Sequence, residues 1–184
     1  MVGMQPPATH ADATGVVRAR DEVARDGELR ACLSRFATGV AVVTFAGPRG
    51  PRGLTVNSFT SVSLRPPLVL ACIARAARSH DDLLSRPFCV NVLGAEQEKL
   101  ARGFAGGRDA STGVAWVAGY GVPRLDRALA YIECRPWRCY DGGDHTIVVG
   151  EVVDCWCRDG DALAYLASRF TTLAEPQLGV EYLL

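Results

Sequence analysis

A run of small hydrogen-bonding side chains interrupts the apolar sequence between residues 53 and 70. The segment begins as a β-branched strand, continues through hydroxyl and amide side chains, and stops at Pro66-Pro67 before an apolar strand. Only Arg65 carries a charge, so this is not simply a solvated surface. Such side chains and nearby backbone N–H groups could bind a neutral, flat ligand with several acceptors and one or two donors. The alternative is a strand-to-loop corner whose Ser and Thr hydroxyls bond to their own backbone.

His145 is the second candidate, because it begins a predicted strand directly after the glycine-containing turn at residues 140–144. A neutral imidazole at the mouth of a strand can stack on, or donate to, a planar ligand that arrives from solvent. The alternative is a turn histidine paired with Asp144 or Asp141. Spacing alone leaves both interpretations open.

Several other chemistries lack their sequence signatures. The chain has no G-x-x-x-x-G-K-[ST] loop and no G-x-S-x-G elbow. Gly47, Gly50 and Gly53 have the spacing G-x-x-G-x-x-G, which is not the dinucleotide fingerprint and precedes a strand. Of the three histidines, His10 lies near the start of the chain, so we expect no three-histidine metal site and no metal.

Composition indicates an ordinary globular protein. The 184 residues are 48% hydrophobic, and 20 Lys and Arg balance 20 Asp and Glu. This balance disfavours nucleic acid and anionic membrane surfaces as partners, and no apolar run is long enough to span a bilayer. None of the seven cysteines forms a C-x-x-C pair, so we expect buried thiols in a reducing compartment.

We expect residues 1–27 to be a partly disordered leader and residues 28–184 to be one domain. The leader lacks the apolar core of a signal peptide, which predicts a cytoplasmic protein. A helical stripe of apolar residues follows from Leu29 to Phe36, with Gly39 where a C-terminal cap would end the helix.

The remaining pattern predicts six or more strands, few of them joined by helices. The strands are expected at 40–45, around Val56, and at 68–73, 88–93, 129–139 and 145–157. Helices are expected after an N-cap at Ser79, at 95–104 and at 161–168, a turn at 47–53 and a mobile loop at 106–113. This order favours a mainly β fold, an antiparallel barrel with peripheral helices.

Three segments, 35–44, 55–70 and 143–152, occur in an order that resembles the flavin reductase family, which has the FMN-binding split-barrel fold. The resemblance spans about Leu29 to Leu173. It is nearest to the short-chain reductase components of two-component flavin-dependent monooxygenases. A flavin ring also meets the description of the flat ligand given above.

The resemblance implies a homodimer that binds a flavin near the subunit interface and reduces free FAD or FMN with NADH or NADPH, NADH being favoured. Hydride would pass from the nicotinamide to flavin N5, and the reduced flavin would diffuse to a separate monooxygenase. The sequence does not decide between FAD and FMN, although the basic segment 75–78 hints at the longer flavin.

The resemblance also implies the site. Residues expected to contact the flavin ring and ribityl chain, or to continue their wall, are Thr55, Asn57, Ser58, Ser61, Val62, Cys72, Ile73, Ala74 and Phe104. Residues expected near the phosphate are Arg78, Ser79 and His80. Residues expected around the nicotinamide are Thr38, Gly39 and His145, of which His145 is the candidate catalytic residue.

Two rival functions remain compatible with this pattern. One is a split-barrel oxidase with tightly bound FMN, and the other is a non-catalytic module that binds flavin or haem.

Overall fold

The structure, a computed structural model, describes residues 19–106, 113–119 and 121–174. The chain divides into two compact units, Met1–Phe36 and Ala37–Leu184. In the first unit, α1 spans Ala19–Leu33, so the predicted helix is confirmed from Leu29 but begins earlier and ends before Gly39. The predicted cap at Gly39 is wrong, because this residue lies in a strand. Most of the predicted 106–113 loop falls outside the described residues.

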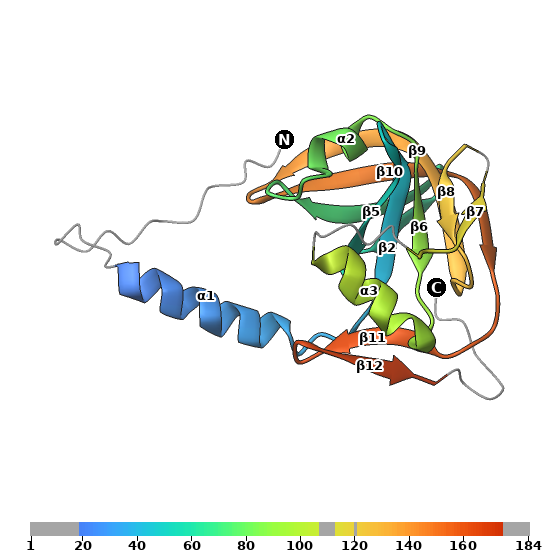
Figure 1. Cartoon of the computed structure of the whole chain (residues 1–184). Coiled ribbons are helices and arrows are strands. Elements are labelled where there is room, and N and C mark those ends of the chain that lie inside the picture. Colours follow the sequence, from blue (N-terminus) through green and yellow to red (C-terminus); the bar gives the residue numbers. More distant parts are fainter. Residues whose placement is uncertain (1–18, 107–112, 120, 175–184) are drawn as a thin grey trace. The chain divides into compact units, whose positions relative to one another are not determined.

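The second unit is mainly β with peripheral helices, as predicted (Figure 1). Its strands are β1 (Thr38–Gly39), β2 (Ala41–Gly47), β3 (Gly50–Val56), β4 (Thr60–Leu64), β5 (Pro67–Ala74), β6 (Phe88–Val92), β7 (Trp116–Ala118), β8 (Pro123–Leu125), β9 (Ala130–Gly142), β10 (His145–Cys157), β11 (Ala162–Leu166) and β12 (Arg169–Leu173). Its helices are α2 (His80–Leu84), the 3-10 turn η1 (Ala95–Gln97) and α3 (Glu98–Ala105). Within the described ranges, no helix is long and apolar enough to cross a bilayer.

Seven strands form one antiparallel sheet in the order β3-β2-β6-β9-β10-β5-β4. A three-stranded sheet has the order β1-β11-β12, and a two-stranded sheet consists of β7 and β8. Figure 1 shows α3 between the large sheet and the β11–β12 hairpin. Because β3 and β4 lie at the two ends of the strand order, the large sheet has two edges that do not pair with each other.

One predicted element is wrong and another is shorter than predicted, and both differences matter for the site. The helix expected at 161–168 is the β11–β12 hairpin, in which Tyr165 pairs with Thr38 of β1 and with Phe170 of β12. This pairing between distant segments overrides the local helical pattern. The turn expected at 47–53 is confined to residues 48–49, because β3 already begins at Gly50 and Arg52 pairs with Phe45.

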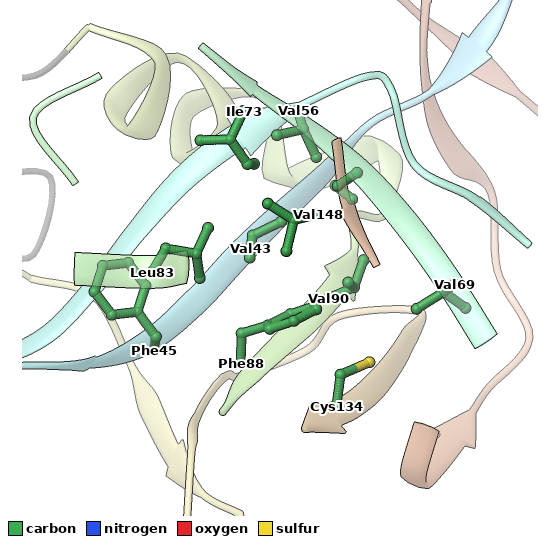
Figure 2. Packing of buried hydrophobic residues seen from close by; sticks show 12 residues of the cluster. Val43, Phe45, Val56, Val69, Ile73, Leu83, Phe88, Val90, Cys134 and Val148 are labelled. Atoms are coloured by element: carbon green, nitrogen blue, oxygen red, sulfur yellow. The ribbon is translucent and has the colours of Figure 1, made fainter. Parts of the chain in front are cut away.

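The core fills the space inside the large sheet, where apolar side chains from β2, β3, β5, β6, β9 and β10 meet α2 (Figure 2). Phe45, Val90, Ile73 and Leu83 are each at most 1% exposed. Side chains point alternately to the two faces of a strand, so inward residues on β5 alternate with residues that face away from this core. That alternation later decides which β5 residues reach the site.

A buried charged cluster fixes β8 against β9 and β10. The Arg124 guanidinium donates to the carboxylates of Glu133 and of Asp154, the latter at 2.7 Å. It also lies over the Tyr131 ring, 3.7 Å from its centroid. Burial disfavours the charged guanidinium, but its interactions with Glu133, Tyr131 and Asp154 together outweigh burial and raise the pKa of Arg124. The guanidinium of Arg124 is therefore held in its charged form in the interior.

Two buried thiols make the free energy of unfolding depend on pH in the alkaline range. Burial raises the pKa of Cys89 and of Cys134 from 9.0 to about 12. Between these values the unfolded chain has released protons that the native protein retains, so the free energy of unfolding falls as pH rises. We expect denaturant titrations from pH 8 to 11 to show this fall. In Cys89→Ala the slope should be smaller by up to about 1.4 kcal/mol per pH unit, the value for one proton.

The control for this prediction is Cys155→Ala, at an exposed strand position. A Cys89→Ala protein with the same pH slope as the wild type would contradict the assignment.

Candidate functional site

A groove of about 750 Å³ lies between edge strand β3 and the end of β5; we call it the main groove. Residues 51–58 form one wall, Cys72 and Ala74 of β5 face them, and the end of α3 borders it. Its volume is in the range of small-molecule and cofactor sites. The groove therefore occupies the place where the large sheet does not close.

Ser58 ties the two sides of this opening together. Its Oγ donates to the Cys72 carbonyl at 3.1 Å and accepts from the Cys72 N–H at 2.9 Å. The hydroxyl thereby takes the place of a neighbouring strand's backbone in pairing with β5. The segment after β3 is thus fixed against β5.

Thr55 has a similar structural role on the other wall. Its Oγ1 donates to the Ala101 carbonyl of α3 at 2.7 Å. Both hydroxyls are therefore bound within the protein, which agrees in part with the alternative that small polar residues here satisfy backbone groups. Asn57 differs, because its amide is exposed and forms no hydrogen bond with another described residue. Asn57 is the side chain of this wall with donor and acceptor available.

Phe104 closes the α3 side of the main groove. Its ring packs on Gly53, where a Cβ would lie 2.8 Å from the Phe104 Cε1 atom. Trp116 meets it edge-on, with the ring centroids 6.1 Å apart. The missing side chain at position 53 therefore allows the helix and its aromatic ring to approach the strand closely.

A second cavity of about 440 Å³, which we call the side pocket, shares residues 55–57 with the main groove. Tyr165 and Phe170 of the β11–β12 hairpin line it, with ring centroids 5.3 Å apart. The Arg102 guanidinium lies 4.8 Å from the Phe170 ring centroid and is paired with Glu98. The side pocket therefore adds an aromatic extension to the site.

His145 borders the main groove from the first position of β10, where it pairs in register with Ala74. Its Nδ1 donates to the Asp144 carboxylate at 2.7 Å. With the proton on Nδ1, the neutral ring has Nε2 as an acceptor. His145 is thus a turn histidine paired with Asp144, and it also borders the groove, which is the position that the ligand-binding interpretation requires.

Arg75 holds the hairpin that carries His145. Its guanidinium donates to the Gly143 carbonyl and to Asp141, both at 2.9 Å. The bond from the Gly143 N–H, followed by the Arg75 contacts, lowers the pKa of Asp141. Of the two arginines in the basic segment 75–78, Arg75 therefore has a positioning role, because its guanidinium is bound to the hairpin.

Three other arginines do border the main groove. Arg78 and Ser79 lie on the α2 side, and Arg49 and Arg52 lie on the β2–β3 hairpin. Ser79 directly precedes α2, but its side chain makes no capping hydrogen bond. The groove is thus bordered by cations from two elements, which suit an anion such as a phosphate.

The structure brings many of the expected site residues to the main groove: Thr55, Asn57, Ser58, Cys72, Ala74, Arg78, Ser79, Phe104 and His145. It does not bring the others there. Ile73 is 1% exposed on the core face of β5, as strand alternation requires. His80 is 7% exposed, with Nδ1 bonded to Asp81 and Nε2 to Thr146.

Four further expected residues lie away from the lining of both cavities. Ser61 and Val62 are exposed on β4, and Thr38 and Gly39 form β1. The site residues that sequence reasoning missed are Arg49, Arg52, Tyr165 and Phe170. The first two were assigned to a turn, although the repeated Pro-Arg-Gly was a visible signal. Tyr165 lay in the segment predicted as a helix.

Residues 33–174 match the family described as Flavin reductase like domain, and the chain belongs to this family. A Streptomyces globisporus protein named NADH-dependent FAD reductase is 50% identical over 134 residues, 68% of this chain and 73% of that protein. The FMN reductase (NADH) SmoA of Agrobacterium fabrum is 43% identical over 143 residues, 77% of this chain and 82% of that protein.

The solved structure of BorF, the flavin reductase component of a bacterial two-component tryptophan halogenase, has a TM-score of 0.75 and 39% identity. The match covers 82% of this chain and 99% of BorF. The split-barrel fold expected from the sequence is therefore confirmed. Among the described residues, no group of three or more His, Cys, Asp or Glu side chains is placed to hold a metal ion.

The Ser58 bridge yields a stability prediction. Ser58→Ala removes both hydrogen bonds to Cys72, and at about 0.5–1.5 kcal/mol each we expect the free energy of unfolding to fall by about 1–3 kcal/mol. Urea titration measures the change. Ser61→Ala is the matched control, because Ser61 is exposed on β4, and its effect should stay within about 0.5 kcal/mol. Equal effects of the two substitutions would refute the bridging role.

Proposed function

We propose that this protein is an NADH-dependent flavin reductase that reduces free FAD or FMN and supplies the reduced flavin to a separate monooxygenase. The observation that carries the proposal is the main groove, which combines polar side chains at residues 55–58, arginines on two bordering elements and His145. Membership of the Flavin reductase like family supports it. So do the two relatives named NADH-dependent reductases, one for FAD and one for FMN.

The residues present fit a flavin. The main groove holds about 750 Å³, and the side pocket adds room beyond residues 55–57. The exposed Asn57 amide offers the donor and acceptor that the edge of an isoalloxazine requires. Cys72 and Ala74 present small side chains and backbone to a flat ring, while Arg78 and Ser79 suit its phosphate.

When bound, the flavin accepts a hydride from NADH, and the protein needs no covalent step of its own. The side chains align two rings and keep water away from them. Phe104 and the β5 end enclose one flat space, and His145 stands at its border, positioned by Asp144 and by the Arg75 clamp. We assign His145 to the wall that receives the nicotinamide.

The monooxygenase partner is proposed because BorF is named as the reductase component of a two-component system. A homodimer is proposed as well, since Leu64, Trp137 and Val153 expose 79%, 43% and 56% of their surface. We also propose a cytoplasmic location, because all seven cysteines are free thiols, as in a reducing compartment.

The function is tested by following the loss of NADH at its absorbance band, with purified protein and added FAD, added FMN or no flavin. We expect rapid NADH oxidation that requires added flavin and saturates with it. A protein that purifies yellow and ignores added flavin would be an oxidase with bound FMN. Tight flavin or haem binding without NADH oxidation would indicate a binding module.

His145→Ala tests the nicotinamide wall. Loss of one stacking face, worth about 0.5–1.5 kcal/mol, should raise the KM for NADH about 2- to 13-fold and leave the Kd for flavin almost unchanged. Steady-state kinetics and calorimetric flavin titration measure the two effects. Asp144→Asn keeps the imidazole but weakens its positioning, so its KM for NADH should rise less. An unchanged KM for NADH with lost flavin affinity would disprove this assignment.

A further inference from the structure

The repeated Gly-Pro-Arg of residues 47–53 is not explained by the reductase chemistry itself. It forms the tip of the β2–β3 hairpin, with Gly47 paired to Gly50 and residues 48–49 in the turn. Gly50 has a φ of +113°, which only glycine adopts without strain. The sequence at this tip therefore meets a backbone requirement and also places two arginines three residues apart.

The hairpin presents both arginines to the main groove. Arg49 and Arg52 line it, and neither forms an ion pair or hydrogen bond with another residue in the described ranges. A Cβ at Gly47 would lie 2.5 Å from the Arg52 Cγ atom, so the stem of Arg52 lies across that glycine. Pro48 and Pro51 restrict the backbone around both arginines. The backbone that carries the two arginines is thus restricted, and both guanidiniums are available to a ligand in the groove.

These arginines add a second cationic position. Arg78 and Ser79 already provide an anion-binding position on the α2 side, enough for the single terminal phosphate of FMN. Arg49 and Arg52 belong to a different element, the hairpin of the edge strand. Their planar guanidiniums can bind phosphate oxygens in pairs. Two cationic positions on separate elements suit a ligand with two linked phosphates.

We propose that Arg49 and Arg52 bind the diphosphate of a dinucleotide in the main groove. The inference rests on the proposed function for its choice of ligand. FAD and NADH share this diphosphate, so either can be its source. If FAD is the source, the hairpin makes the protein prefer FAD to FMN.

The test is calorimetric binding to wild type and to the double variant Arg49→Ala/Arg52→Ala. The probes are FAD, FMN and riboflavin, which carry two, one and no phosphates, together with ADP and AMP. We expect the double variant to weaken FAD and ADP about tenfold or more, and FMN, AMP and riboflavin less than about twofold, with a flatter salt dependence for FAD. Arg49→Lys/Arg52→Lys should restore part of the affinity.

The control is Arg138→Ala, which removes an exposed charge on β9 outside the groove. A raised KM for NADH and weaker ADP binding, with FAD unchanged, would support the proposal and identify NADH as the source. Equal losses for all three flavins, equal losses for FAD and FMN, or no loss for any probe and an unchanged KM for NADH would overturn it. ADP and AMP binding separates this result from failure of the reductase function, because neither probe needs turnover.

Discussion

The site depends on how one hydroxyl group holds the large sheet at the place where it stays open. Ser58 bonds to both backbone groups of Cys72, and this pair of bonds substitutes for the strand pairing that β3 and β5 lack. If the sheet closed fully there, backbone ladders would occupy the space of the main groove. If nothing bridged the opening, the segment after β3 would have no fixed distance from β5. The groove lies beside this hydrogen-bonded bridge, where β3 and β5 do not pair as strands.

The side chains that hold the groove together are different from those that remain available to a ligand. The hydroxyls of Ser58 and Thr55 form hydrogen bonds within the protein, and the Phe104 ring packs directly on Gly53. A ligand is left with the Asn57 amide, with backbone groups and with the arginines that border the groove. Such a site can hold a flat ligand in one orientation without many directed bonds. Moderate affinity is what a protein that hands on its reduced ligand needs.

The sequence predicted the architecture where patterns are local. The strands at 88–93 and 145–157 and the helix at 95–104 follow from alternation and helical spacing, and they are present. The segment at 161–168 could not be assigned locally, because its strand forms by pairing with β1, far away in the sequence. Position within a strand was also decisive: Cys72 and Ala74 reach the groove, whereas Ile73 between them enters the core.

The expected polar residues of the site were found by type, but their bonds could not be. The sequence does not show that both ring nitrogens of His80 form hydrogen bonds, one with Asp81 and one with Thr146, because Thr146 lies on a distant strand. The same holds for Arg75, which clamps the hairpin of His145. The repeated Pro-Arg-Gly was visible in the sequence, but the location of its arginines at the groove depends on β3 beginning at Gly50.

The buried Arg124 cluster limits how this chain can diverge. A Cβ at Gly119 would lie 2.0 Å from the Glu133 Oε1 atom and 2.5 Å from the Arg124 Nε atom. A larger residue at position 119 therefore requires the Arg124–Glu133 ion pair to shift, and loss of Arg124 alone would remove the cationic partner of the buried Glu133 carboxylate. Positions 119, 124 and 133 should accordingly covary among related sequences. The arginines of the exposed hairpin tip should vary independently of these three positions.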